Sequence, residues 1–208
     1  MGQAQAMRRR ALIAAPAFFV APKFFVDQAA ATTLVGALQA GGVVVVMRHG
    51  ITDRSQADTG DLRNRAAQRN LSDAGRAQAQ RVGAAVAALR IPIGQVLASP
   101  VFRARDTAEI AFGARAVVEP MLNADDYTPD PMRLDQQIAW LRARSGRPSG
   151  PAVTDILVGH IVPLGMVLGR GLTQAEYPEG AMAIFAPGPD TGRLLGILPA
   201  DALFVAAG

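Results

Sequence analysis

The sequence has only two histidines, and each follows directly after a short apolar segment. His49 comes after Val43–Met47 and Arg48, and His160 comes after Asp155–Val158 and a glycine. Such runs of branched apolar residues are typical of buried strands. Either histidine alone could be an ordinary core residue. Two that follow strands are candidates for one site, because ligands in open α/β folds bind at the carboxyl edge of the sheet.

Two arginines are expected at the same edge. Arg48 precedes His49, and Arg103 lies four residues beyond Ser99, where another apolar segment ends. Guanidinium groups bind phosphate oxygens through paired hydrogen bonds, and an imidazole can be a nucleophile or a hydrogen-bond partner. A metal site is the rival interpretation, but two nearby cations would repel a metal ion. The four side chains therefore predict a phosphoryl site without a metal.

Length and composition favour one globular domain. Half of the 208 residues are hydrophobic and 18% are charged, and the absence of cysteine excludes disulfides, thiolate metal sites and a cysteine nucleophile. The net charge of +4 comes mostly from the first 31 residues. Without them, 21 positive and 17 negative residues become 17 and 16, a net charge of +1. A nucleic-acid-binding face is therefore not expected.

The N-terminus resembles an export signal. Arg8–Arg10 precede the apolar stretch Ala11–Ala21, and small residues follow at Ala29–Ala31. The pair Arg9-Arg10 in front of apolar residues is similar to a twin-arginine signal. We expect residues 1–31 to form a signal peptide that is cleaved after Ala30 or Ala31, with the mature protein in the periplasm.

The alternatives are an uncleaved membrane anchor and a cytoplasmic protein. Pro16, Pro22 and Lys23 interrupt the apolar stretch well short of the roughly 20 residues that a span requires. Contact with a membrane is therefore expected only through the export signal. Residues 32–208 are expected to form the functional domain.

Apolar runs alternate with helical patterns along this domain. Strands are expected at 43–47, 95–99, 116–119, 155–158, 181–186 and 193–198, and helices at 32–39, 72–89, 102–112, 131–144 and 163–168. The alternation predicts an α/β three-layer sandwich, in which helices cover both faces of a mostly parallel central sheet. Thr32 or Thr33 is the expected cap of the first helix, and Ser72 that of the second. The polar segments 51–70 and 123–131 are expected to be loops that select the substrate.

Four segments also form an ordered set of motifs. Val43–Gly50 contains Arg-His-Gly, Asn70–Ala79 reads N-L-S-D-A-G-R-A-Q-A, Ser99–Ala108 reads S-P-V-F-R-A-R-D-T-A, and Val158–His160 contains the second histidine. A tripeptide alone is a weak signal, but four segments in order are specific. Together they resemble the histidine phosphatase superfamily, which includes phosphoglycerate mutases and small phosphatases. The resemblance extends from about Val43 to Leu198.

The resemblance implies a role for each of these side chains. His49 would attack phosphorus and become a phosphohistidine, and Arg48, Arg103 and His160 would bind the phosphoryl oxygens. Water would then hydrolyse the intermediate, with no metal or other cofactor. The chain would be a phosphoric monoester hydrolase that acts on a small-molecule or protein phosphate.

The sequence departs from the family pattern at the proton donor. Many members have a glutamate two residues after a leucine, but here Leu122 is followed by Ala124 at that distance. Asp125 is the first candidate for the general acid, with Asp126 and Asp53 as alternatives. Two other functions stay open: a non-catalytic phosphate- or phosphoprotein-binding module on the same fold, and a phosphotransferase or mutase.

Overall fold

The centre of the molecule is a six-stranded sheet with the strand order β3-β2-β4-β1-β5-β6, seen in a computed structural model that describes residues 28–208. Strands β1, β2, β3 and β4 run parallel, β5 runs antiparallel to β1, and β6 runs antiparallel to β5. The prediction of a mostly parallel sheet is confirmed. The strands are β1 (Val43–Arg48), β2 (Ile93–Ala98), β3 (Ala116–Val118), β4 (Thr154–Gly159), β5 (Met182–Ala186) and β6 (Arg193–Leu198).

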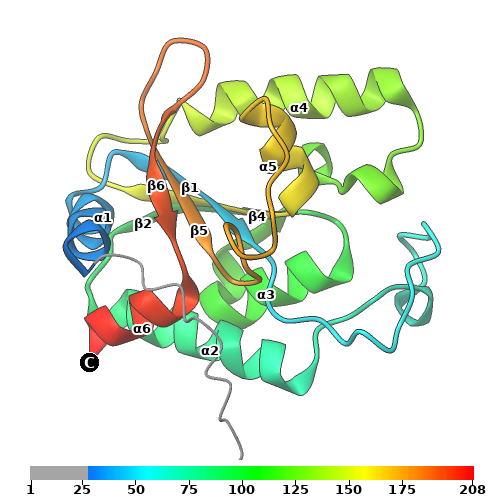
Figure 1. Ribbon diagram of the computed structural model, residues 1–208, viewed down its shortest axis with the longest axis horizontal. Helices are drawn as coiled ribbons and strands as arrows, with labels where there is room; N and C mark the ends of the chain where they lie inside the picture. The colour runs from blue at the N-terminus through cyan, green and yellow to red at the C-terminus, as the bar shows by residue number, and fades with distance from the viewer. Residues whose placement is uncertain (1–27) are drawn as a thin grey trace, which may run out of the picture.

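Helices cover both faces of this sheet and complete the three predicted layers (Figure 1). On one face α2 packs against α3 and α6, and α1 packs against α6; on the other face α4 packs against α5. The helices are α1 (Gln28–Ala40), α2 (Asp73–Ala88), α3 (Phe102–Phe112), α4 (Pro131–Ser145), α5 (Ile161–Val167) and α6 (Ala200–Ala207). Within residues 28–208, no helix has both the length and the apolar character to cross a bilayer.

The apolar run of β1 is buried on both sides because the strand lies inside the sheet, between β4 and β5. Its side chains alternate, so that Val43, Val45 and Met47 join the core under α1, α2, α3 and α6, whereas Val44 and Val46 join the core under α4. Full burial of each side chain contributes about 1.5–3 kcal/mol. Because side chains of β1 pack into the cores on both faces of the sheet, the position at which the strand ends is fixed.

The register between β1 and β4 brings the two histidines to one edge. Arg48 is paired with Gly159 in the parallel ladder. The next residue of each strand, His49 and His160, therefore leaves the sheet at the same level. The juxtaposition expected from the two apolar runs is confirmed.

The first turn of α2 packs directly against the chain that follows His49. Ser72 caps the helix as predicted, since its hydroxyl accepts a hydrogen bond of 3.1 Å from the Gly75 amide. A Cβ atom at Gly75 would lie 1.9 Å from the carbonyl oxygen of Ile51. Only glycine permits this approach, so the first turn of helix α2 packs closely against the His49 loop, residues 49–52.

The predicted caps of α1 are wrong. The helix begins at Gln28, and the hydroxyls of Thr32 and Thr33 donate to the carbonyls of Gln28 and Ala29, each at 2.9 Å. Both threonines therefore lie in the helix interior, where a hydroxyl bonds the carbonyl four residues earlier. Residues 1–27 of the predicted export signal lie outside the described residues. The remaining residues of that segment, 28–31, belong to α1.

Three further elements differ from the prediction. Helix α5 begins at Ile161 rather than at Pro163, because a proline is tolerated throughout the first helical turn, where its missing amide has no partner to lose. Strand β2 begins two residues early, where Ile93 pairs with Thr154 of β4. The short helix α6 was not predicted, and it packs through the buried Leu203 against the core.

Candidate active site

The two histidine rings face each other at the edge of the sheet. Their centroids lie 5.4 Å apart with an interplanar angle of 55°. The side chains are buried, with exposed fractions of 3% for His49 and 5% for His160. Two buried imidazoles at this distance can flank a group of the size of one phosphoryl.

The His49 ring is oriented by its own loop. Its Nδ1 lies 2.9 Å from the carbonyl oxygen of Gly50. A carbonyl only accepts, so Nδ1 carries the proton and Nε2 keeps a free lone pair. The Gly50 amide in turn donates to the Thr107 hydroxyl, which donates to the carbonyl of Arg103. These hydrogen bonds connect the His49 loop to helix α3.

The surroundings keep His49 neutral. Burial is the main cause that lowers its pKa well below the ordinary value, and the positive charges of Arg103, Arg48 and Arg69 lower it further. The pKa of His160 is lowered in the same way, by burial first and then by Arg103 and His49. An unprotonated imidazole with a free Nε2 is the nucleophilic form of the side chain.

His160 is held by the end of the second strand. Its Nε2 lies 2.9 Å from the Ser99 hydroxyl oxygen, which also accepts a hydrogen bond of 3.2 Å from the Val101 amide. The Nδ1 atom is buried and has no hydrogen-bond partner among residues 28–208. If the Ser99 hydroxyl donates to Nε2, then Nδ1 carries a proton that is available to an acceptor.

Residues in the segment before β5 hold the Arg48 side chain in place. Its Nη1 donates to the side-chain oxygen of Gln174 and to the carbonyl of Tyr177, both at 2.7 Å. The side chain is buried, and its Nε finds no acceptor within the described part of the chain. A buried guanidinium with spare donors is suited to an oxyanion.

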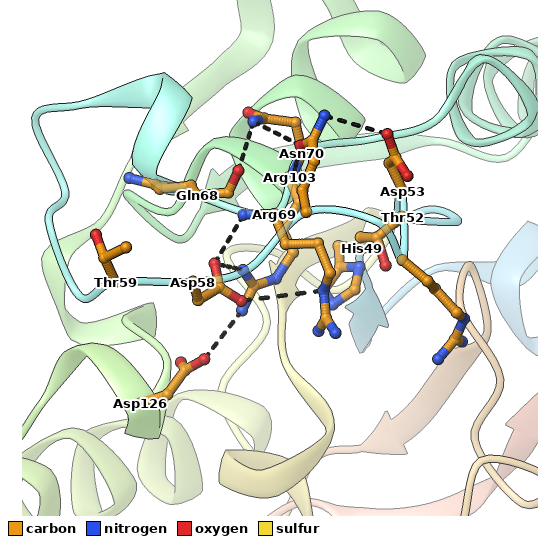
Figure 2. A network of polar contacts seen from close by, with 12 residues as sticks. His49, Thr52, Asp53, Asp58, Thr59, Gln68, Arg69, Asn70, Arg103 and Asp126 are labelled. Atoms are coloured by element: carbon orange, nitrogen blue, oxygen red, sulfur yellow. Dashed lines mark hydrogen bonds and ion pairs between the residues drawn. The ribbon is translucent and has the colours of Figure 1, made fainter.

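Arg103, from the first turn of α3, meets two carboxylates. Its Nη1 donates to Asp58 Oδ1 at 2.9 Å, and its Nη2 lies 3.6 Å from Asp126 Oδ2 (Figure 2). Its Nε is also buried and unpaired within residues 28–208. Arg103 and Arg48 therefore both present charged donors beside His49.

Asp58 is the centre of the polar network in Figure 2. Besides Arg103, its Oδ1 accepts from the Tyr127 hydroxyl at 2.5 Å and from the Arg69 amide at 2.9 Å. Burial acts to raise the pKa of Asp58, but the hydrogen bonds from Tyr127 and Arg69 and the charge of Arg103 outweigh it and the pKa is lowered. Asp58 is therefore a carboxylate that positions Arg103, and it is a poor proton donor.

A family model agrees with this site. The model of the histidine phosphatase superfamily (branch 1) matches residues 44–125, a range that contains Arg48, His49 and Arg103. Over this range the chain is similar to the histidine phosphatase superfamily. This similarity supports phosphatase activity in general terms.

Solved structures support the fold of this superfamily. The protein histidine phosphatase SixA complexed with tungstate is 19% identical, with 77% of this chain and 99% of that chain covered and a TM-score of 0.53. A candidate phosphohistidine phosphatase SixA from Agrobacterium tumefaciens is 20% identical, with 76% and 97% covered and a TM-score of 0.51. A candidate alpha-ribazole-5'-P phosphatase from Escherichia coli is 18% identical, with 74% and 96% covered and a TM-score of 0.51. No curated protein matches the chain.

Of the three carboxylates considered as general acid, Asp126 is the one that the structure brings to the phosphatase site. Asp125 and Asp126 open the same 3-10 turn, but within the described residues the Asp125 side chain makes no hydrogen bond or ion pair with Arg103 or the histidines. The Asp53 carboxylate accepts from the amide and hydroxyl of Ser55 and is turned into its own loop. Asp126 therefore replaces Asp125 as the first candidate for the general acid.

Asp126 has a property that a proton donor needs, although its side chain is 45% exposed. Burial raises its pKa above the ordinary value, and the nearby carboxylates of Asp125 and Asp58 raise it further against the opposing charge of Arg103. A larger fraction of this carboxyl group is therefore protonated near neutral pH than of an ordinary aspartate.

Several residues that support the site were missed by sequence reasoning. Asp58 and Gln174 lie outside helices and strands, and Tyr127 ends a 3-10 turn of three residues, so no hydrophobic period indicates that their side chains point inward. Glu179 received no role, yet its carboxylate accepts a hydrogen bond of 2.7 Å from Thr52 in the His49 loop. No signal in a single sequence distinguishes these residues from solvated loop residues.

No group of three or more His, Asp or Glu side chains that could hold a metal ion occurs among the described residues.

Proposed function

We propose that this chain is a phosphatase that hydrolyses its substrate through a phosphohistidine intermediate on His49. The observation that carries the proposal is the pair of neutral, buried histidines 5.4 Å apart, flanked by the buried guanidinium groups of Arg48 and Arg103. A neutral nucleophile between fixed cations matches the demands of phosphoryl transfer, in which positioning and charge stabilisation provide most of the rate.

In the first step, the Nε2 lone pair of His49 forms a bond to phosphorus while the bond to the leaving group breaks. Arg48 and Arg103 stabilise the negative charge on the phosphoryl oxygens, and His160 donates a hydrogen bond from Nδ1. The Ser99 hydroxyl supports this tautomer of His160 by donating to Nε2 at 2.9 Å. The carbonyl of Gly50 stabilises the positive charge that develops on the His49 ring, because it accepts a hydrogen bond from the Nδ1–H group.

The leaving group takes its proton from Asp126. This assignment rests on the 3.6 Å contact of Asp126 with Arg103 and on its raised pKa. In the second step, the resulting carboxylate accepts a proton from water, whose oxygen attacks phosphorus and breaks the bond to His49. Phosphate leaves, and Asp126 is protonated again, so both steps balance.

The substrate is a phosphorylated small molecule or protein. The fold-level similarity to a protein histidine phosphatase makes phosphohistidine one substrate to include in a screen. Phosphohistidine and acyl phosphates have good leaving groups, which reduces the demand on a partly exposed acid such as Asp126.

Hydrolysis of p-nitrophenyl phosphate by the purified full-length chain, without added metal, tests the proposal. We expect turnover by the wild type and loss of at least a thousandfold in kcat in His49→Ala. Arg63→Gln is the matched control, because this arginine side chain is 96% exposed and pairs only with Asp61 at 3.9 Å among the described residues. Turnover that survives in His49→Ala would contradict the mechanism. Phosphate binding without any turnover would favour a non-catalytic module.

A further inference from the structure

We propose that Gln78 is a positioning residue, which keeps His49 in line with the phosphoryl group by joining two backbone segments of the site. The inference rests on the proposed function, since it adds a residue to the machinery of the same reaction. Gln78 lies in the second turn of α2 and is half-buried. Both hydrogen bonds of its side chain go to backbone groups, so it acts through the chain around His49 and not on the substrate.

The two hydrogen bonds define the orientation of the Gln78 amide. Its Oε1 accepts from the Ile51 amide at 3.1 Å, and its Nε2 donates to the Glu179 carbonyl at 3.0 Å. A backbone N–H only donates and a carbonyl only accepts, so the two partners decide which end of the side chain is oxygen. The position therefore requires an acceptor and a donor on one planar group, which an amide provides and a carboxylate does not.

Helix α2 binds both backbone groups of Ile51. The Ile51 carbonyl accepts from the Ser72 amide at 3.0 Å and from the Ser72 hydroxyl at 3.2 Å, and Gln78 accepts from the Ile51 amide. Ile51 is two residues beyond His49 in the His49 loop. The start of α2 therefore determines the path of the chain as it leaves the proposed nucleophile.

The second segment that Gln78 binds also supports Arg48. Residues 174–180 provide the two acceptors for the Arg48 side chain. At the end of this segment, the Gly180 amide donates to the carbonyl of His49 at 2.9 Å. The hydrogen bond from Gln78 is accepted one residue earlier. Gln78 thus holds this segment at the point where it meets the backbone of His49.

Two glycines leave room for the amide of Gln78. Gly180 has a φ angle of 85°, and a Cβ atom there would lie 2.7 Å from Gln78 Nε2. A Cβ atom at Gly50 would lie 3.3 Å from Gln78 Oε1. The amide is therefore packed between two stretches of backbone, and close packing restricts its orientation in addition to the hydrogen bonds.

This arrangement predicts an effect on rate more than on binding. Without Gln78, the His49 loop and residues 174–180 can shift relative to each other, and the His49 ring moves with its loop. A displacement of about 1 Å from the line of attack can cost about a hundredfold in rate. Phosphate binding is shared among several cationic side chains, so it depends less on the position of one ring.

Gln78→Met tests this prediction, because methionine has a similar length but lacks the amide. We expect kcat for p-nitrophenyl phosphate to fall by about 10–100-fold. The Kd of inorganic phosphate, measured by isothermal titration calorimetry, should change far less. Gln80→Met is the matched control, since Gln80 is exposed on the same helix, and it should behave like the wild type. Circular dichroism and thermal unfolding report whether each variant is folded.

Gln78→Glu adds a pH profile that a purely structural role would not produce. A carboxylate cannot donate to the Glu179 carbonyl, but a protonated carboxyl group can donate there and still accept from the Ile51 amide. The ratio of kcat in Gln78→Glu to kcat in the wild type should therefore rise as the pH falls from about 8 to about 5.5. The same ratio for Gln78→Met should not change with pH.

Hydrogen exchange of the Ile51 amide, followed by NMR, separates this inference from the proposed function. Exchange should be at least about tenfold faster in Gln78→Met and unchanged in Gln80→Met. If exchange accelerates but the wild type shows no turnover, then the contact stands and the phosphatase function fails.

Three results in an active wild type would overturn the role of Gln78. The first is wild-type kcat in folded Gln78→Met, and the second is a loss of phosphate affinity as large as the loss of kcat. The third is a ratio for Gln78→Glu that does not change with pH. An equal loss of kcat in Gln80→Met would also contradict the inference, because that variant leaves both hydrogen bonds of Gln78 in place.

Discussion

At the scale of single residues, the site contains titratable groups whose pKa values are shifted in opposite directions. Burial and neighbouring arginines lower the pKa of His49, so the proposed nucleophile stays neutral. Burial raises the pKa of Asp126, whereas hydrogen bonds lower that of Asp58. Pairs of titratable groups whose environments push their pKa values apart are typical of acid and base assignments. These opposite shifts support the proposal that Asp126 is the proton donor, whereas Asp58 stays a carboxylate.

The assignment of Asp126 is tested by leaving groups of different basicity. Asp126→Asn should reduce kcat for an alkyl phosphate by about 10²–10⁴-fold, which is the usual contribution of a general acid. Hydrolysis of p-nitrophenyl phosphate should change far less, because p-nitrophenolate leaves without a proton. Steady-state kinetics with the two substrates give the comparison.

Asp125→Asn is the matched control, since Asp125 lies next to Asp126 in the same turn. It should leave the ratio of the two rates near that of the wild type. A leaving-group effect in Asp125→Asn alone would return the role to Asp125. Equal, wild-type rates in both variants would show that neither carboxyl group is the acid.

At the scale of elements, two helices hold the His49 loop in place. Helix α3 supplies Arg103 and, through Thr107, a hydrogen bond to the Gly50 amide. Helix α2 contributes the close approach of Gly75 to Ile51. Since the contact joins two backbones, no change of side-chain rotamer can relieve a clash there.

Gly75→Ala should therefore disturb both stability and activity. We expect the free energy of unfolding to fall by about 1–3 kcal/mol, the usual cost of overpacking. The value of kcat/KM should also fall, because Ile51 lies two residues beyond His49. Urea unfolding and hydrolysis of p-nitrophenyl phosphate give the two values.

Gly36→Ala, inside helix α1, is the control, because a Cβ atom there meets nothing within 4 Å. It should leave activity unchanged and raise the free energy of unfolding by about 0.5–1 kcal/mol, the helical preference of alanine over glycine. A Gly75→Ala variant as stable and active as the wild type would show that the contact with Ile51 does not constrain the loop.

Sequence reasoning succeeded where a periodic pattern or a motif carried information. The apolar runs of β1 and β4 placed His49 and His160 at one edge, and Ser72 marked the start of α2. It failed where tertiary contacts decide, as in the loop that brings Asp58 to Arg103. The acidic pair 125–126 was found, but its sequence does not indicate which carboxylate lies near Arg103.

At the scale of the whole molecule, burying two neutral histidines links the site to stability. Their folded-state pKa values lie well below the ordinary value of 6.5. The unfolded chain therefore binds more protons than the folded chain once the pH drops below about 6.5. The contribution to stability is complete above this pH and is lost as the pH falls.

We expect the free energy of unfolding to decrease by about 1 kcal/mol for each histidine between pH 6.5 and pH 5.5. Aspartate and glutamate side chains mostly titrate below this window. Urea unfolding at the two pH values measures the loss, and His160→Asn should reduce it by about half. Equal stability at both pH values, or the same loss in His160→Asn, would show that buried neutral histidines do not govern the pH dependence.

The covalent intermediate is the central claim, and trapping it on His49 is the most direct test. The full-length chain is mixed with ³²P-labelled acetyl phosphate, quenched in alkali within the first turnovers and analysed by peptide mass spectrometry. The account predicts a label on His49 that survives base and is lost in acid, as a phosphoramidate is, and no label in His49→Ala. A label on another residue, or turnover by the wild type with no phosphorylated His49, would contradict it.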